Sequence, residues 1–145
     1  MPVLPNDLDA NKDIVRQFFD AVSNADYAAL DRLVADDYDD HRTGQRGRPA
    51  LIGYFQDSHR ALSGMRIIID SIVAEGDRVM VRNRIVGVHQ GEMMGIAPSG
   101  RAIDVAAMQE YRVEAGRLAA HWEVADALTL LQQVGATGLP ESASG

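Results

Sequence analysis

The sequence has no cysteine among its 145 residues and only one lysine, Lys12. The lack of cysteine excludes disulfides, thiol nucleophiles and thiolate metal sites. No apolar run approaches membrane-spanning length, and residues 1–7 lack the basic segment and apolar core of a secretory signal. We therefore expect a soluble protein that stays in the cytoplasm and does not associate with a membrane.

Positive charge is also scarce, because 21 acidic residues outnumber 14 basic ones and the net charge is −7. Nucleic acids are bound through clustered lysine and arginine, and no such run occurs, so a nucleic-acid partner is not expected. The nucleotide, zinc-protease and serine-hydrolase motifs are missing, and the four histidines have no HxH spacing. We predict no metal site and no cofactor, and a small molecule as the ligand.

The chain length suits one domain over 1–145, with a core at about 10–136 and loose ends at 1–8 and 136–145. Apolar residues at three- and four-residue spacing predict helices at 13–23, 27–34 and 48–64. Apolar and alternating stretches predict strands at 65–73, 78–89, 101–112 and 117–126, followed by a short helix at 127–134. Helices followed by antiparallel strands predict an α+β fold, with the helices packed on one face of a curved sheet.

An acidic run, Asp36–Asp40, places four carboxylates in five positions. Hard cations want several oxygen ligands, but the run lacks the glycine and the second ligand set of a calcium loop. We expect a solvated acidic turn here, and a short extended segment that His41 closes. His41 follows the run and is a candidate to face inward.

The last predicted strand has two unlike faces. Trp122 and Val124 lie on its apolar face, whereas His121 and Glu123 share the other face. If that face lines a cavity, the imidazole and the carboxylate are candidates for acid/base chemistry. The alternatives are a polar face turned to water or a carboxylate paired with an arginine.

Three stretches, Glu75–Val79, Gly87–Arg101 and Gly116–Gly135, resemble the SnoaL-like polyketide cyclases. The resemblance covers about residues 10–136 and includes His121-Trp122-Glu123. These cyclases belong to the superfamily that contains nuclear transport factor 2 and ketosteroid isomerase. The resemblance implies a cone-shaped α+β domain in which three N-terminal helices and a curved antiparallel sheet enclose a pocket.

The resemblance also implies cofactor-free aldol closure of a polyketide ring, with a carboxylic acid as general acid/base. In the cyclases this acid is an aspartate two residues after the strand histidine, a position occupied here by Glu123. One extra methylene moves the proton donor by about an ångström, and a shift of that size can cost on the order of a hundredfold in rate. A histidine of the cyclases on the preceding strand corresponds to Gln109, which can orient a carbonyl but cannot carry a proton.

The functional hypothesis is therefore a homo-oligomer, either a dimer or a tetramer, whose apolar pocket binds a bulky carbonyl compound. Glu123 transfers the proton, and His121 tunes the pKa of Glu123. Gln109 and Asn83 orient the substrate oxygen. Epoxide opening, isomerisation and non-catalytic ligand binding remain alternatives for the same pocket. Further substrate-binding candidates are His41, His89, Tyr54, Phe55, Phe18, Met93, Met94, Ile96 and Asp126, the last of which could instead cap the C-terminal helix.

Overall fold

The computed structural model describes residues 7–136, so most of the two predicted loose ends, 1–6 and 137–145, lies outside the described residues. Helix α1 (Leu8–Ser23) begins five residues before the predicted start at Asp13. Its N-cap is Asp7, whose carboxylate accepts a hydrogen bond of 3.0 Å from the amide of Ala10. The cap supplies an acceptor to a first-turn amide that has no partner within the helix, and the helix starts there.

The other predicted helices are confirmed. Helix α2 (Tyr27–Leu33) is capped by Asp26, and helix α3 (Arg48–Ala61) carries Pro49 in its first turn. The short helix α4 (Ala127–Gln133) is capped by Asp126, which accepts from the amide of Thr129 at 3.1 Å. No helix within residues 7–136 is long and apolar enough to cross a membrane.

The sheet has the strand order β2-β1-β6-β5-β4-β3. Strands β3 to β6 pair antiparallel with their sequence neighbours, as the tight connections predict. Strand β1 runs parallel to β6, so the sheet is mixed and the prediction of a purely antiparallel sheet is wrong at this pair. Strands β1 and β6 are far apart in sequence, so no hairpin fixes their relative direction. The strands are β1 (Val34–Asp40), β2 (Gln45–Arg46), β3 (Leu62–Glu75), β4 (Arg78–His89), β5 (Ala102–Glu114) and β6 (Arg117–Ala125).

The acidic run is part of strand β1, which confirms the short extended segment before His41. Asp36 and Asp37 are exposed, whereas the expectation of a solvated turn is wrong for Asp40. Val34 and Tyr38 are buried in the core, and Asp40 is only 4% exposed. Tyr38 and Asp40 are two residues apart on a strand and therefore share its inward face. A high local density of carboxylates did not keep the strand in water, because Asp40 finds its partners inside the protein.

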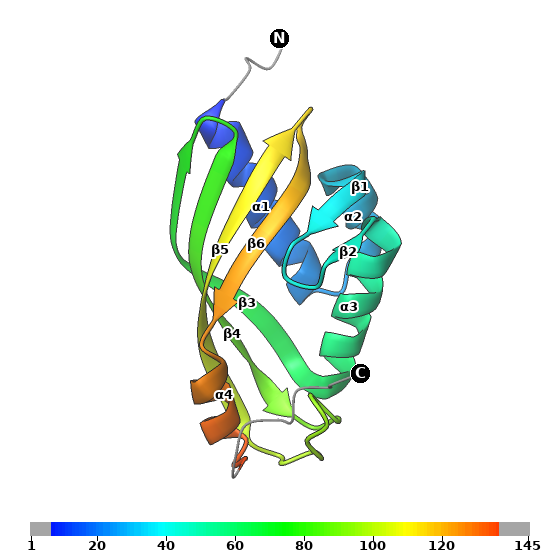
Figure 1. Ribbon diagram of the computed structural model, residues 1–145, viewed down its shortest axis with the longest axis vertical. Helices are drawn as coiled ribbons and strands as arrows, with labels where there is room; N and C mark the ends of the chain where they lie inside the picture. Colours follow the sequence, from blue (N-terminus) through cyan, green and yellow to red (C-terminus); the bar gives the residue numbers. More distant parts are fainter. Residues whose placement is uncertain (1–6, 137–145) are drawn as a thin grey trace.

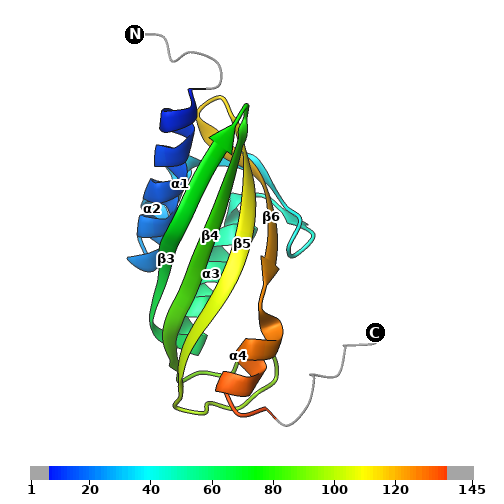
Figure 2. The same cartoon turned by 90° about the vertical axis from the view of Figure 1, so that its left-hand side faces the viewer.

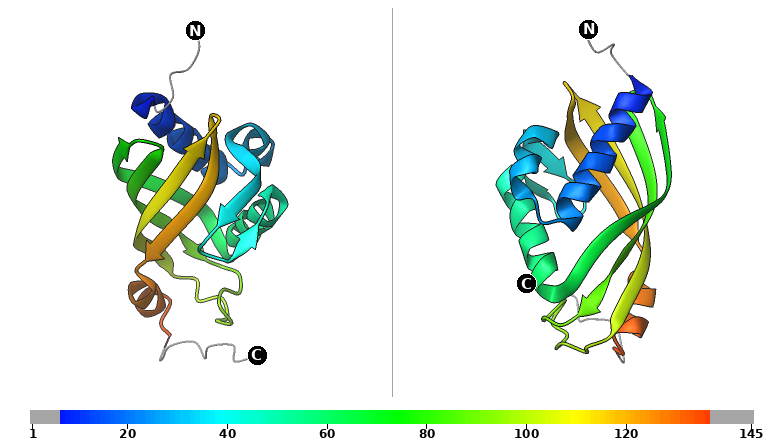
Figure 3. Two further views of the ribbon diagram at one scale, coloured as in Figure 1. Left: turned by 45° about the horizontal axis from the view of Figure 1, so that its top comes forward. Right: turned by 180° about the vertical axis from the view of Figure 1, so that it is seen from behind.

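Helices α1, α2 and α3 cover one face of the curved sheet, and α4 lies at the end of the molecule remote from the start of α1 (Figures 1, 2 and 3). The core fills the space between the helices and the sheet. Aromatic rings meet there, with the Phe18 ring centroid 5.9 Å from that of Phe55 and 5.8 Å from that of Tyr111. This packing places the inward side chains of β4, β5 and β6 beneath the helices.

Candidate active site

Strand β6 turns its polar face toward the helices. His121 is 2% exposed and the side chain of Glu123 is 9% exposed, whereas Val124 on the opposite face is 77% exposed. The interpretation of a polar face in water is therefore wrong. The strand places two titratable groups inside the protein and leaves an apolar side chain outside.

His121 is held at both ring nitrogens. Its Nδ1 lies 3.2 Å from Oδ1 of Asp40, and its Nε2 lies 2.8 Å from Oε1 of Gln109. Sheet register produces these contacts, because His121 pairs with Asp40 on β1 and with Tyr111 on β5. A carboxylate oxygen and an amide oxygen thus fix the orientation of the ring from its two sides.

The side-chain oxygen of Gln109 already has two hydrogen-bond partners within the protein. The hydroxyl of Tyr111 donates to Oε1 at 2.7 Å, in addition to the bond from His121. Burial raises the pKa of Tyr111 well above its ordinary value, so the hydroxyl keeps its proton and donates. Gln109 Nε2 in turn donates to Oδ1 of Asn83 at 2.9 Å. In the structure Gln109 therefore orients His121, and its contact with a substrate oxygen stays a prediction.

Asp40 stays ionised. Burial alone would raise its pKa, but the hydrogen bond from His121 and the nearby charge of Arg42 outweigh burial and lower the pKa to about 2. A carboxylate with such a pKa is an anchor for cations and not a proton donor at neutral pH.

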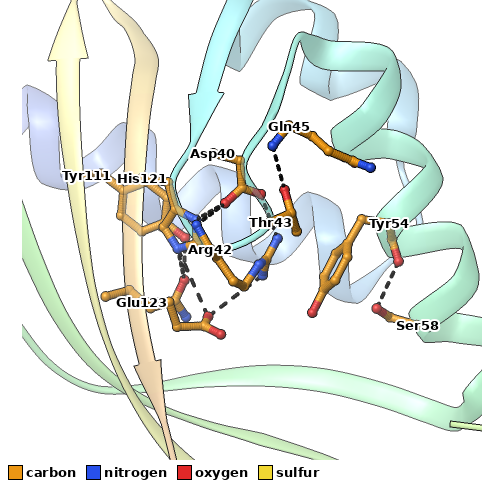
Figure 4. Close-up of polar contacts among 10 residues, drawn as sticks. Asp40, Arg42, Thr43, Gln45, Tyr54, Ser58, Tyr111, His121 and Glu123 are labelled. Atoms are coloured by element: carbon orange, nitrogen blue, oxygen red, sulfur yellow. Dashed lines mark hydrogen bonds and ion pairs between the residues drawn. The ribbon is translucent and has the colours of Figure 1, made fainter. Parts of the chain in front are cut away.

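Arg42 links the two carboxylates of the cluster. Its Nη2 donates to Asp40 Oδ2 at 2.9 Å, and its Nη1 lies 3.8 Å from Oε2 of Glu123. The guanidinium carbon sits 3.7 Å from the centre of the Tyr54 ring, so Arg42 fills the space between α3 and β6 (Figure 4). Its Nε is buried and has no hydrogen-bond partner.

Sequence reasoning missed both Asp40 and Arg42. The spacing of Tyr38 and Asp40 could have indicated a shared buried face, since both lie on a strand with Val34. No pattern marks Arg42, which follows the strand in a turn and reaches back to the cluster.

Four titratable side chains thus meet inside the protein: the carboxyl groups of Asp40 and Glu123, the guanidinium of Arg42 and the imidazole of His121. Buried charges seldom stabilise a fold, because the desolvation penalty offsets their attraction. A core that contains such a cluster is therefore better explained by chemistry than by stability.

Glu123 is the least constrained member. Its Oε2 lies 4.0 Å from His121 Nε2 and 3.8 Å from Arg42 Nη1, both longer than a hydrogen bond. The carboxylate thus lies beside a guanidinium and an imidazole without a short bond to either. This leaves its oxygens available to a substrate or to a transferred proton.

The other candidates are dispersed. Phe18 and Phe55 are core residues, and Tyr54 is 37% exposed beside Arg42. His41 stacks on Trp122 at a ring-centroid distance of 4.6 Å, which puts it on the sheet face opposite Glu123.

The remaining five candidates lie near the end of the sheet at which β4 and β6 finish. Asp126 uses its carboxylate to cap α4. His89 is fully buried, with Nδ1 2.9 Å from the Ser99 hydroxyl and Nε2 without a partner. Met93 and Ile96 pair through their backbones and pack on the core, while Met94 between them is 48% exposed.

Two open hollows lie elsewhere on the surface. One of about 490 Å³ is bordered by Arg16 and Asp20 of α1 and by Asp70 of β3. Another of about 400 Å³ is bordered by Asp36 of β1 and by Arg117 of β6. Neither hollow is lined by Asp40, Arg42, His121 or Glu123.

Comparison with known proteins identifies the family to which a chain with this fold belongs. The family model for SnoaL-like polyketide cyclases matches residues 12–134, which is most of the chain. The chain belongs to the SnoaL-like polyketide cyclase family. None of the curated proteins matches the sequence closely enough to be reported as a relative.

Solved structures of SnoaL-like proteins and their relatives share this fold. TsrD from Streptomyces laurentii is 26% identical with a TM-score of 0.82, over 88% of this chain and 96% of TsrD. IdmH from Streptomyces antibioticus, provisionally assigned as a polyketide cyclase, is 29% identical with a TM-score of 0.78, over 86% of this chain and 98% of IdmH. A SnoaL-like protein from Jannaschia sp. CCS1 is 17% identical with a TM-score of 0.81, over 96% and 100% of the two chains, and shows the fold alone.

Proposed function

We propose that this SnoaL-like protein is a cofactor-independent acid/base enzyme that closes a ring in a bulky carbonyl compound by an aldol reaction. One observation carries the proposal: the Glu123 carboxylate lies inside the protein, 4.0 Å from His121 and 3.8 Å from Arg42, with no hydrogen bond to either. Membership of the cyclase family supports the reaction type.

The proposed chemistry uses one proton. Glu123 removes it from the carbon next to a substrate carbonyl, and the positive charge of Arg42, with the imidazole of His121 next to it, stabilises the enolate oxygen. The enolate carbon then attacks a second carbonyl of the same molecule, and the new alkoxide takes the proton back from Glu123. Asp40 and Gln109 contribute by holding His121 in position.

A second candidate is the opening of an epoxide by a water molecule that Glu123 activates. The observation in its favour is that Arg42 lies between two carboxylates, Asp40 and Glu123. Asp40 is ionised and cannot protonate the leaving oxygen, so this reaction would need His121 as the acid. The aldol reaction requires one fewer proton donor and is preferred.

The test is proton exchange at the carbon next to the carbonyl of acetylnaphthalene in deuterated water, followed by NMR. Enolisation is the first step of the aldol route and needs no knowledge of the natural substrate. Wild type should accelerate the exchange, and Glu123→Gln should lose on the order of a hundredfold or more while binding is retained. The matched control is Glu114→Gln, an exposed carboxylate on β5 that should leave the rate unchanged.

Binding of the ketone without exchange in wild type would contradict the enzyme proposal and favour a binding module. Hydrolysis of an aromatic epoxide that depends on Glu123, without ketone exchange, would favour the second candidate.

We also propose that the protein assembles into a dimer or tetramer through the outer face of the sheet. Met80, Met108 and Val124 are 40%, 55% and 77% exposed on this face. Register places Met108 directly opposite Val124, so these apolar side chains are adjacent. A second copy of the chain would cover them.

A further inference from the structure

Arg42 and Glu123 lie close together inside the protein but are not joined by a hydrogen bond. Nη1 of Arg42 is 3.8 Å from Oε2 of Glu123, and the two side chains are 16% and 9% exposed. Attraction between a guanidinium and a carboxylate is strong away from water, and such pairs normally close to about 2.8 Å. Another contact must therefore keep Arg42 away from Glu123.

Hydrogen bonds fix one end of the Arg42 guanidinium and leave the orientation of its plane open. Nη2 of Arg42 donates to Oδ2 of Asp40 at 2.9 Å. One such bond sets a distance but allows the guanidinium to turn about Nη2. Nε of Arg42 is buried without a hydrogen-bond partner in the described part of the chain, so no bond at Nε prevents this turn. A turn toward β6 would bring Nη1 to Glu123.

A restraint on the plane comes from helix α3. The guanidinium carbon of Arg42 lies 3.7 Å from the centre of the Tyr54 ring, which is a close cation–π contact. Tyr54 is on the α3 side of Arg42, and Glu123 is on the β6 side (Figure 4). The ring therefore attracts the guanidinium in the direction away from Glu123.

The Tyr54 ring is itself held in place and stays neutral. It meets the Phe55 ring edge to face, with 5.3 Å between the centroids, and Phe55 is buried in the core. Burial raises the pKa of Tyr54 and outweighs the opposing effect of Arg42, so the hydroxyl keeps its proton. Arg42 thus contacts the face of an uncharged ring, and this contact leaves the positive charge of the arginine unpaired by Tyr54.

We propose that Tyr54 is a positioning residue that keeps Arg42 out of hydrogen-bond distance of Glu123. The separation leaves the carboxylate free to take a proton from substrate, and it leaves Nη1 free to bind the enolate oxygen. The inference rests on the proposed function, because enolisation needs both a free base and a free cation. It differs from the predicted role of Tyr54 as a substrate contact, because here the ring acts through Arg42.

Tyr54→Leu removes the ring and is the test variant. Its crystal structure should show Nη1 of Arg42 within about 3 Å of a Glu123 oxygen. In deuterium exchange of acetylnaphthalene, kcat should fall on the order of tenfold or more, because Arg42 then occupies the base. KM should stay within a few fold of the wild-type value, since the variant leaves the substrate contacts in place.

Two controls separate this role from a general effect on the fold. Tyr54→Phe keeps the aromatic face and should match wild type in both measurements. Tyr27→Leu is the matched control, since it removes a partly buried ring of α2 that packs on the core. It should change neither the distance between Arg42 and Glu123 nor the exchange kinetics.

Phenylalanines with increasing numbers of ring fluorines, placed at position 54, test the attraction without removing the ring. Fluorine withdraws negative charge from the face of the ring and weakens its attraction for a cation, while the shape changes little. The value of kcat should fall as fluorines are added. This series applies even if Tyr54→Leu does not fold, and a kcat that is independent of fluorination would overturn the inference.

A distance of 3.8 Å between Arg42 and Glu123 that persists in Tyr54→Leu would also overturn it. So would a rise in KM with kcat unchanged, which would make Tyr54 a substrate contact. Absence of exchange in wild type would overturn the proposed function alone, because the distance in Tyr54→Leu is measured without turnover.

Discussion

His121 Nδ1 lies 3.2 Å from Oδ1 of Asp40, which joins two residues 81 positions apart in the chain. The parallel pairing of β1 with β6 makes this contact, because Asp40 is the register partner of His121. The strand pairing that departs from the antiparallel prediction is thus the one that completes the buried cluster.

The ionisation of Asp40 should make the free energy of unfolding decrease at acidic pH. Its pKa is lowered from 3.8 to about 2 in the folded protein, so the ionised form contributes stability above pH 4 that is lost as the pH falls through about 2. The contribution is about 2 kcal/mol. Urea unfolding of wild type between pH 5 and pH 2 should show this loss, and Asp40→Asn should lack it. Asp57→Asn, at an exposed position, should keep the wild-type pH dependence.

Arg42 should be more important for stability than an exposed arginine. Arg42→Met leaves Asp40 and Glu123 without the cation between them, and breaking a buried ion pair costs about 3 kcal/mol or more. Arg42→Lys should recover part of this, because lysine restores the charge but not the planar contact with Tyr54. Arg16→Met, at a half-exposed helix position, should change the free energy of unfolding by less than about 0.5 kcal/mol. Equal losses for Arg42→Met and Arg16→Met would contradict the assignment.

The loop after β4 packs against the C-terminal end of α3 at Gly91. A β-carbon at Gly91 would lie 2.3 Å from the backbone oxygen of Arg60, so Gly91→Ala must displace backbone and should cost about 1–3 kcal/mol. Gly53, inside α3, has open space around it, and Gly53→Ala should stabilise by about 0.5–1 kcal/mol. Thermal unfolding of the two variants measures the contrast, and stabilisation by both would show that the loop is not packed this closely.

The outer sheet face should control assembly. Met108→Glu and Val124→Glu place charge among adjacent exposed apolar side chains and should shift the protein toward monomer in light-scattering chromatography. Met94→Glu is the control, since Met94 is 48% exposed in the loop after β4. A wild type that is monomeric at high concentration would contradict assembly through this face.

Much of the fold could be predicted because its signals are local. The alternation along 117–126 predicted strand β6, with His121 and Glu123 on one face, and Asp126 was recognised as a cap for the helix that follows. Local periodicity does not say which face is covered. Burial of His121 and Glu123, with Val124 left exposed, depends on the helices that pack on the inner face of the sheet.

The rest of the site depends on contacts between distant segments. Asp40 looked like one of several carboxylates in a solvated run, because no local feature shows that β1 enters the sheet beside β6. Gln109 was assigned to the substrate because its two internal donors, Tyr111 and His121, become visible only with the sheet register. The chemistry of the side chains was enough to select the candidate residues. Their hydrogen-bond partners depend on the strand register, which the sequence does not show.

A crystal structure of the protein with acetylnaphthalene tests the central claim most directly, read at the Glu123 carboxylate. The account predicts the ketone inside the fold, with its methyl carbon next to a Glu123 oxygen and its carbonyl oxygen facing the guanidinium of Arg42 and the imidazole of His121. A ketone bound only in the hollow between α1 and β3, with Glu123 joined to Arg42 by short hydrogen bonds, would contradict it.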